Sequence, residues 1–376
     1  MYVIFKPSLH CNLRCRYCYE QHAPNRCEMT DAELEQALRF LMALAKLRGD
    51  RRMTLCWHGG ELFSVPLEKL IRGMALAEQL SAETGIKIKQ SAQTNLTLAT
   101  PVHADLVKRF LGGHIGVSLD VGSKCRLMAN GEDAEPLITE KLDMMRSAGV
   151  HCGAITMITR QNLHDIPKIY EFFAQRRMCA RLSRVFPLEY PFDASDEMFV
   201  TDEEFAQAEI EYFETWLADT GHYPDADIIR LLGDMLIGRP STCARSGKCA
   251  GEHISVSPGG GLFSCAHFDA TDKSIGNFKT DAPETVLANV RKFTTDHCRP
   301  PSSCSACRYF RICHGGCVSH LVNFGFPYEC KADKIYWAHL ERWLSRFGLG
   351  LYDLAGKSSE EIRRVLADIL TRGSEG

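Results

Sequence analysis

Three cysteines near the start of the chain, Cys11, Cys15 and Cys18, constrain the fold and the chemistry more than any other feature of the sequence. They are separated by three and then by two residues, directly after a short apolar run over 2–5. Three thiolates on one tight loop can bind three irons of a [4Fe-4S] cluster, which leaves the fourth iron without a protein ligand. An open metal position serves substrate chemistry, whereas structural metal sites are closed. The alternatives are a zinc knuckle or cysteines that are neighbours by chance.

The composition limits the classes of protein to which the chain can belong. Of its 376 residues 17 are cysteines, an odd count with cluster-like spacings, which disfavours a secreted disulfide framework and predicts a reducing compartment. The net charge of −3 gives no nucleic-acid footprint. No apolar stretch approaches membrane-spanning length, and the N-terminus lacks the basic and apolar regions of a signal peptide. We therefore expect a cytoplasmic protein that binds neither nucleic acid nor membrane.

The first half of the chain alternates strand-like and helix-like segments. The predicted strands are Tyr2–Phe5, Met53–Trp57, Ile86–Ala92, His114–Leu119, Cys152–Ile158 and Arg181–Phe186. The predicted helices are Asp31–Leu47, Leu67–Glu83, Val102–Phe110, Pro136–Ser147 and Ile166–Arg176, and the first starts with a capping box of Thr30 and Glu33. Six β-then-α units predict an α/β fold with a parallel sheet and helices outside it. Ligands bind such sheets at the carboxyl ends of the strands.

Short polar motifs follow the second, third and fourth predicted strands. After the second strand comes a Gly-Gly-Glu motif at 59–61, in which paired glycines let the backbone approach a ligand closely and a carboxylate can accept from an ammonium group. An ordinary turn is the alternative there. Asn95 follows the third strand, and Ser118 and Asp120 end the fourth. Such short polar groups suit the hydroxyl and carboxylate groups of a small ligand, with helix caps as the alternative.

The cysteine triplet, with the aromatic Tyr17 before its last member, resembles the signature of the radical S-adenosylmethionine (AdoMet) enzymes. The resemblance implies a partial (β/α)6 barrel whose open iron chelates the amino and carboxylate groups of AdoMet. One electron from the cluster then splits AdoMet to a 5′-deoxyadenosyl radical, so the cofactor carries the difficult chemistry. The Gly-Gly-Glu motif, one strand later, is similar to the family motif that meets the methionyl amino group.

The resemblance also implies which residues contact the cosubstrate. Ser118 matches a serine that contacts AdoMet in related enzymes, and Ile155 matches an apolar residue that packs on the adenine, with a core role as the alternative. The family tends to place an arginine where this chain has Asn130, so Arg126 is the nearest guanidinium for the AdoMet carboxylate. The expected cosubstrate residues are Tyr17, Gly59, Gly60, Glu61, Asn95, Ser118, Asp120, Arg126 and Ile155.

A second group of cysteines lies between residues 243 and 330. Two strand-like pieces, His253–Ser257 and Leu262–Ser264, flank a glycine turn and predict a hairpin that Cys265 closes. This region resembles the SPASM domain, which holds two auxiliary [4Fe-4S] clusters in peptide-modifying members of the family. The resemblance assigns Cys243, Cys249, Cys265 and Cys317 to the first auxiliary cluster, and Cys304, Cys307, Cys313 and Cys330 to the second. Four thiolates would close each cluster, and zinc is the alternative metal.

We therefore predict four segments: a radical AdoMet barrel over 1–187, a helical bridge over 188–242, a SPASM domain over 243–335 and a helical C-terminal tail over 336–376. In the bridge, the apolar pattern predicts helices over Asp202–Ala218 and Ala226–Ile237. In the tail, Ser358 and Glu361 form a capping box for a further helix. The expected cofactors are AdoMet and three [4Fe-4S] clusters.

In length and layout the chain resembles anaerobic sulfatase-maturating enzymes and maturases of ribosomally made peptides. The sulfatase maturases carry an aspartate directly after the third ligand of the first auxiliary cluster, where it acts as a base. Here Ala266 stands at that position, followed by His267. Because a base must be positioned to act, we predict a peptide maturase instead. It would abstract hydrogen from a residue of a precursor peptide and leave a crosslink or a similar modification.

Two other functions stay open. One is a sulfatase maturase that forms formylglycine with His267 or Asp269 as the base, and His267 is the nearest titratable candidate for any proton transfer. The other is a non-catalytic electron-transfer or metal-binding protein. The expected partners are a precursor peptide or protein and a flavodoxin- or ferredoxin-type reductant. Because the first strand begins at residue 2, we expect no N-terminal leader-binding module, so the barrel, the SPASM surface, the tail or a separate protein would recognise the precursor.

Overall fold

The computed structural model describes residues 1–22, 27–187, 195–219, 225–240, 243–247, 249–268 and 272–373. Residues 188–194, which begin the predicted bridge, and Asp269 lie outside these ranges. Within the described part of the chain, no helix combines the length and the apolar character that crossing a membrane requires.

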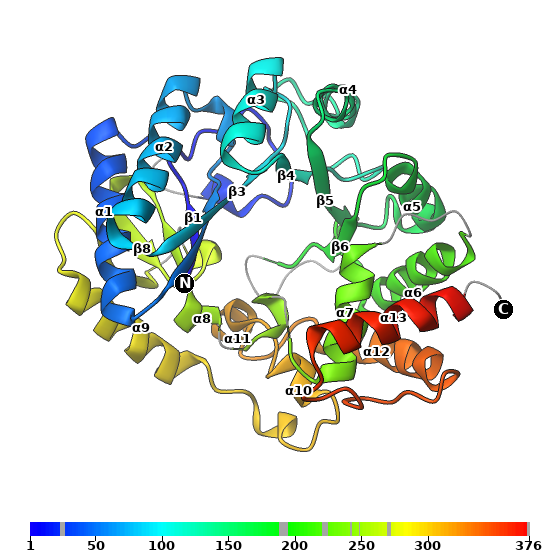
Figure 1. The fold of residues 1–376 in the computed structure, drawn as a ribbon. Coiled ribbons are helices and arrows are strands. Elements are labelled where there is room, and N and C mark those ends of the chain that lie inside the picture. Colours follow the sequence, from blue (N-terminus) through cyan, green and yellow to red (C-terminus); the bar gives the residue numbers. More distant parts are fainter. Residues whose placement is uncertain are drawn as a thin grey trace. The chain divides into compact units, whose positions relative to one another are not determined.

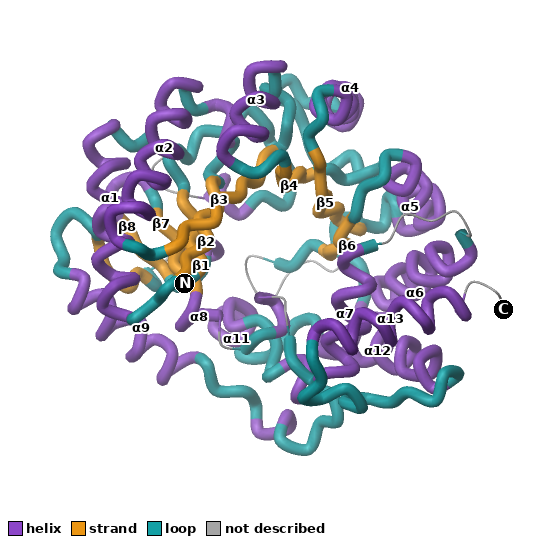
Figure 2. The backbone as a smooth tube through the Cα atoms, viewed as in Figure 1, coloured by secondary structure: helices purple, strands orange, loops and turns teal. Residues whose placement is uncertain are grey.

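The centre of the α/β fold is a sheet whose first six strands follow the order of the chain, as Figure 2 shows. These strands are β1 (Tyr2–Phe5), β2 (Arg52–Trp57), β3 (Lys87–Thr94), β4 (His114–Ser118), β5 (His151–Ile158) and β6 (Ala180–Arg184). From β1 to β4 each strand pairs in parallel with the next, and β5 pairs in parallel with β6. The predicted succession of strands in a parallel sheet is therefore confirmed.

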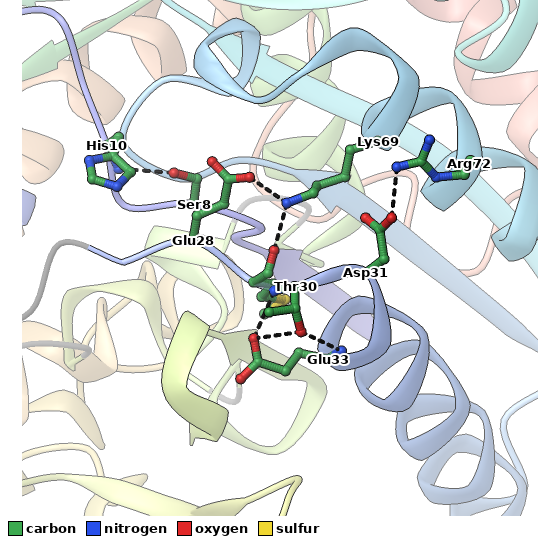
Figure 3. Close-up of polar contacts among 9 residues, drawn as sticks. Ser8, His10, Glu28, Thr30, Asp31, Glu33, Lys69 and Arg72 are labelled. Carbon is green, nitrogen blue, oxygen red and sulfur yellow. Dashed lines mark hydrogen bonds and ion pairs between the residues drawn. The ribbon is translucent and has the colours of Figure 1, made fainter.

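Helices connect these strands, and they are α1 (Asp31–Arg48), α2 (Leu67–Thr84), α3 (Pro101–Phe110), α4 (Glu135–Ser147) and α5 (Ile166–Gln175). α1 begins at the predicted capping box, in which the Thr30 hydroxyl accepts from the Glu33 amide and the Glu33 carboxylate accepts from the Thr30 amide (Figure 3). Leu34, Leu38 and Leu41 lie on its buried face. Figure 1 shows α1 and α2 alongside β1 to β3, so this part of the sheet is covered by helices.

Three more strands extend the sheet beyond β1, namely β7 (His253–Val256), β8 (Gly261–Phe263) and β9 (Ser274–Asn277). β7 and β8 form the predicted antiparallel hairpin, and β8 also pairs with β9. The sequence did not predict that β7 pairs in parallel with β1, with Phe5 opposite Val256. Without β7, one row of backbone donors and acceptors on β1 would lack strand partners. The strand order is β6-β5-β4-β3-β2-β1-β7-β8-β9.

The chain forms two compact units. The first comprises Met1–Asp120, Lys124–Gly153 and Lys248–Cys298, and the second comprises Val121–Ser123, Ala154–Gly247 and Arg299–Gly376. Much of the segment predicted as a SPASM domain therefore belongs to the unit that contains the cysteine triplet. The physical reason is the pairing of β7 with β1. The predicted division into four segments stays a prediction.

The second unit is mainly helical in the part that the structure describes. It contains the predicted helices α6 (Asp202–Ala218) and α7 (Ala226–Ile237), followed by α10 (Phe310–Cys313), α11 (Val318–Phe324), α12 (Cys330–Ser345) and α13 (Ser359–Gly373). α6 packs on α12 and α7 packs on α13 (Figure 1). The predicted capping box of the tail helix is present, because the Ser358 hydroxyl accepts from the Glu361 amide. Two further helices, α8 (Cys249–Glu252) and α9 (Pro283–His297), belong to the first unit.

Candidate cluster and cosubstrate site

The cysteine triplet lies in the loop that follows β1, at the carboxyl edge of the parallel strands. The backbone of a neighbouring segment holds this loop. The Arg14 amide donates to the Leu127 carbonyl at 2.7 Å, and the Arg16 amide donates to the Cys125 carbonyl at 3.0 Å. Leu13, in the middle of the loop, is buried. A fixed loop at this edge is where parallel sheets bind ligands.

The three thiols of the triplet are close enough to interact electrostatically. Burial raises the pKa of Cys15 to about 12, against the opposing charge of Arg126, and the charges of Cys18 and Cys11 raise it as well. Among the described residues, no three His, Cys, Asp or Glu side chains are already arranged around a metal position. Neighbouring thiols beside a guanidinium nevertheless fit an iron–sulfur cluster, because coordination to a metal deprotonates thiols that burial keeps neutral.

The two glycines of the Gly-Gly-Glu motif lie directly against the backbone that leads into the cysteine loop. A Cβ at Gly59 would lie 2.1 Å from the Ser8 carbonyl oxygen, and a Cβ at Gly60 would lie 2.3 Å from that of His10. The Gly60 amide also donates to the Ser8 carbonyl at 3.0 Å. Contact with the loop therefore requires glycine here, whereas the sequence suggested contact with a ligand as the reason.

Glu61 is buried, and three donors bind its carboxylate. One oxygen accepts from the Phe63 amide at 2.9 Å and from the Thr94 hydroxyl. The other oxygen accepts from the Asn95 amide at 2.7 Å. Burial raises the pKa of Glu61, and these three hydrogen bonds oppose the rise. The carboxylate thus joins the segment after β2 to the end of β3, and its contact with the AdoMet ammonium group stays a prediction.

Asn95 and Asn12 connect the end of β3 with the cysteine loop. The Asn95 side-chain amide donates to the Asn12 side-chain oxygen at 3.2 Å and lies 3.9 Å from the Cys11 sulfur. The Asn12 side-chain amide in turn donates to the Thr97 hydroxyl at 2.8 Å. Asn95 therefore helps to hold the first cysteine. No sequence motif predicted the contacts of Asn12.

Tyr17, Asp120 and Arg126 form a charged group beside Cys15. The Tyr17 hydroxyl donates to the Asp120 carboxylate, and the Arg126 guanidinium lies 3.0 Å from the same carboxylate. Arg126 also donates to the Cys15 sulfur at 3.7 Å, and its guanidinium lies 5.6 Å from the centre of the Tyr17 ring. The structure thus brings three of the predicted cosubstrate residues together. They contact one another and the cysteine loop.

Ser118 and Ile155 complete the predicted cosubstrate set. The Ser118 hydroxyl, at the end of β4, accepts from the Gln93 side-chain amide at 2.8 Å. Ile155 is a half-buried residue of β5 and belongs to the second unit. The contacts of both residues with AdoMet stay predictions.

The candidate base His267 lies in a short turn after β8, over Ala266–Phe268. Ala266 is buried, whereas His267 is half-buried. The His267 ring packs edge-on against Tyr19, with 4.8 Å between the ring centres. The candidate base therefore contacts the residue that directly follows the cysteine triplet.

The four cysteines expected to bind the second auxiliary cluster line one cavity of about 830 Å³ within the second unit. They are Cys304, Cys307, Cys313 and Cys330. Burial raises the pKa of Cys313 to about 12, and the charges of Asp333 and Cys330 raise it as well. Lys334, one helical turn after Cys330 on α12, also lines the cavity. Four cysteines around one cavity fit a cluster that thiolates close.

The four cysteines expected to bind the first auxiliary cluster are divided between the two units. Cys249, which begins α8, and Cys265 belong to the first unit. Cys243 and Cys317, which precedes α11, belong to the second unit. Their assignment to a single cluster stays a prediction.

A buried ion pair between Lys6 and Glu20 is a feature of the site that no sequence motif predicted. Lys6 directly follows β1, and Glu20 follows the last cysteine of the triplet by two residues. A charged residue at the end of an apolar strand, ahead of the predicted metal-binding loop, was the signal that could have revealed Lys6.

The cysteine triplet lies in a part of the chain that is similar to a known family. Residues 5–173 match the Radical SAM superfamily. The chain is 24% identical over 335 residues to a serine-type anaerobic sulfatase-maturating enzyme of Klebsiella aerogenes, with 86% of this chain and 81% of that enzyme covered. The fold is similar to that of native anSMEcpe with bound AdoMet and Cp18Cys peptide, with a TM-score of 0.77, 18% identity, and 98% and 99% of the two chains covered. It is also similar to SuiB of Streptococcus suis bound to precursor peptide SuiA, with a TM-score of 0.59, 15% identity, and 87% and 74% covered.

Proposed function

Residues 5–173 form the radical SAM domain of an enzyme that acts on a peptide or protein residue, and from this premise we propose that the chain is a maturase of ribosomally made peptides. The enzyme abstracts hydrogen from one residue of a precursor peptide and leaves a crosslink or a similar modification. The relative from Klebsiella aerogenes is an enzyme, which argues against the non-catalytic alternative.

The residues of the first unit have distinct parts in this proposal. AdoMet and a [4Fe-4S] cluster, when bound, supply the 5′-deoxyadenosyl radical. Cys11, Cys15 and Cys18 are the iron ligands of that cluster. Arg126 and Asn95 hold two of these sulfurs in place. The Gly-Gly-Glu motif fixes the loop. Glu61 accepts a hydrogen bond from the methionyl ammonium group, because an ionised carboxylate only accepts hydrogen bonds and an ammonium group only donates them.

The observation that carries the proposal is Ala266. A buried apolar side chain occupies the position at which sulfatase maturases are expected to carry their base. Formation of formylglycine requires the substrate radical to lose a proton to a positioned group. A crosslinking reaction depends more on a second side chain that is held close to the radical, because proximity supplies much of the rate.

The proposed crosslink is an oxidation of the substrate by two electrons. The substrate loses one hydrogen atom to the radical, and the resulting carbon radical bonds to a second side chain. The product then loses one proton and one electron. His267 is the proposed proton acceptor, and an auxiliary cluster, held by the predicted cysteine ligands when bound, would provide an acceptor for the electron. Over the whole reaction the peptide loses two hydrogen atoms.

Two auxiliary [4Fe-4S] clusters and an external reductant belong to the same proposal. The cavity lined by four cysteines in the second unit supports one of these clusters. The reductant is a protein of the flavodoxin or ferredoxin type, because the radical cluster must receive one electron for each AdoMet cleaved. The enzyme works in the cytoplasm, where thiols stay reduced.

A second candidate function is the maturation of sulfatases, and a specific observation favours it. The compared relative from Klebsiella aerogenes is a serine-type anaerobic sulfatase-maturating enzyme, and the alignment covers most of both chains. In this chain the base would then be His267, which lies one residue beyond the expected position.

Mass spectrometry of two candidate substrates decides between these functions. The anaerobically reconstituted enzyme is incubated with AdoMet, dithionite and either a short precursor peptide encoded near its gene or a sulfatase peptide with a Cys or Ser target. We expect the precursor to lose the mass of two hydrogen atoms and the sulfatase peptide to stay unchanged. Formylglycine on the sulfatase peptide, abolished by His267→Ala, would establish the second function instead.

A further inference from the structure

A buried ammonium group lies where the cysteine loop meets the turn over Ala266–Phe268. The Lys6 amide donates to the Val256 carbonyl of β7 at 2.9 Å, and the Lys6 residue is fully buried. Its Nζ pairs with the Glu20 carboxylate and donates to the Ala266 carbonyl at 3.5 Å. One cation therefore contacts both the end of the cysteine loop and the turn that carries the candidate base.

An aromatic contact joins the same two segments. The Nζ of Lys6 lies 5.2 Å from the centre of the Tyr19 ring, which is within the range of a cation–π interaction. The Tyr19 ring also packs against the His267 ring. Burial, followed by the charge of Lys6, lowers the pKa of His58 to about 4, so the His58 imidazole stays neutral. The negative charge that pairs with Lys6 is that of the Glu20 carboxylate.

Stability alone is a weak reason for such an arrangement. Removing two charges from water offsets much of their mutual attraction, and apolar residues of similar volume often serve a protein's stability equally well. An ammonium group offers three directed donors, so one side chain can bind a carboxylate and a carbonyl at the same time. What this pair provides, and an apolar pair would not, is a fixed geometry between the segments that it joins.

We propose that Lys6 is a positioning residue that holds the turn over Ala266–Phe268 against the cysteine loop. This inference rests on the proposed function, because the turn matters only if His267 borders the peptide that is modified. The distance between the radical source and this side of the substrate site then depends on Lys6. Loss of Lys6 lets the turn move, so radicals form but are used less often to modify the peptide.

The test compares variants that separate positioning from folding. Lys6→Met leaves Glu20 buried without its cation, so the double variant Lys6→Met/Glu20→Gln is the principal one, because removing both charges preserves the fold better than removing one. Lys6→Arg keeps the charge and should rescue part of the effect. The matched control is Arg48→Met. Arg48 pairs with Asp50 at 2.7 Å and donates to the Gly251 carbonyl at 2.8 Å, so it also tethers the 248–298 segment, but at the amino edge of the strands.

Two measurements on the anaerobically reconstituted enzymes decide the matter. Amide hydrogen exchange over 266–268 should become at least about tenfold faster in the double variant, as loss of a hydrogen bond to a charged group predicts, and stay unchanged in Arg48→Met. With whichever of the two peptides the wild type converts, the ratio of 5′-deoxyadenosine to modified peptide should rise by about tenfold, since misplacement by about 1 Å can cost a hundredfold in rate.

Exchange that is unchanged in the double variant, or equally faster in Arg48→Met, would overturn the inference. A wild type that converts neither peptide would instead overturn the proposed function, and the exchange measurement would still decide whether Lys6 holds the turn. A raised ratio without faster exchange would also count against Lys6 as a positioning residue, because the effect would then arise without movement of the turn.

Discussion

At the scale of single residues, Glu61 serves the fold as well as the predicted chemistry. Its carboxylate accepts from Phe63, Thr94 and Asn95. A Gln side chain has only one accepting oxygen, so Glu61→Gln leaves at least one of these buried donors unpaired. Hydrogen bonds to charged groups contribute about 1.5–3 kcal/mol, so we expect the free energy of unfolding to fall by about 2 kcal/mol. Chemical denaturation measures this change.

The same substitution tests the predicted contact with AdoMet. If Glu61 accepts from the methionyl ammonium group, Glu61→Gln weakens AdoMet binding by about ten- to a hundredfold. Equilibrium dialysis with labelled AdoMet provides the measurement. Glu78→Gln is the control, because Glu78 forms an exposed ion pair with Arg109. Reduced stability with unchanged AdoMet affinity would restrict Glu61 to a structural role.

Arg126 lies close enough to Cys15, a predicted cluster ligand, to influence the electron affinity of a cluster bound there. It donates to the Cys15 sulfur and pairs with Asp120. A positive charge beside a thiolate stabilises the reduced cluster, which carries one more negative charge. We therefore expect Arg126→Gln to shift the midpoint potential of the radical cluster to more negative values, measured by an EPR-monitored redox titration. The surface control Arg109→Gln should leave the midpoint potential unchanged. An unchanged potential in Arg126→Gln would refute an influence of the Arg126 guanidinium on the cluster.

At the scale of elements, the contact between the Gly-Gly-Glu motif and the cysteine loop should tolerate no side chain. In Gly60→Ala the new Cβ would lie 2.3 Å from the His10 carbonyl oxygen and 2.6 Å from that of Leu9. The loop must shift, which we expect to cost about 3 kcal/mol, the upper end of the usual range for overpacking, and to reduce iron binding. Thermal unfolding and iron analysis measure both effects. Gly153→Ala is the matched control, because no atom lies within 4 Å of the added Cβ.

The packing of α6 on α12 predicts a pH-dependent stability. Burial raises the pKa of Glu209 to about 8, against the charge of Arg245, which lies 3.9 Å from Glu209 and 2.8 Å from Asp333. The folded chain then keeps a proton that the unfolded chain has already released above its ordinary pKa of 4.5. The free energy of unfolding therefore falls as the pH rises from that value to about 8.

Denaturant titrations across this pH window test the prediction for Glu209. The neutral variant Glu209→Gln should flatten the dependence, because it has no proton to lose. Glu214→Gln is a control on the same helix, since Glu214 is half-exposed and pairs with His339. Equal slopes for wild type and Glu209→Gln would mean that other groups set the pH dependence.

At the scale of the whole molecule, the eleven assigned cysteines predict the metal content. Three [4Fe-4S] clusters correspond to about twelve irons and as many sulfides per chain. The triple variant Cys11→Ala/Cys15→Ala/Cys18→Ala should keep about eight irons and lose the reductive cleavage of AdoMet, because the triplet is the one predicted ligand set that would leave an iron open. Iron and sulfide analysis with Mössbauer spectroscopy measures the content. Stoichiometric zinc, or 5′-deoxyadenosine formed by the triple variant, would contradict the assignment.

The sequence by itself determined the features that local signals carry. The apolar periodicity and the capping box of Thr30 and Glu33 define α1, and similar patterns define the alternating strands. The spacing of the triplet after β1 indicated where the candidate site lies, because parallel sheets bind ligands at the carboxyl ends of their strands. These features depend on residues that are close together in the chain, so the pattern of a short segment is sufficient to predict them.

Only the tertiary structure decided which distant segments meet. The pairing of β7 with β1, the contact of Gly60 with the His10 carbonyl and the approach of Lys6 to the Ala266 carbonyl each join parts of the chain that no local pattern relates. The sequence supplied the glycines and the lysine, but their reasons lie in backbone groups that a sequence does not distinguish. Every residue carries the same amide and carbonyl, and folding alone selects which of them a buried side chain will contact.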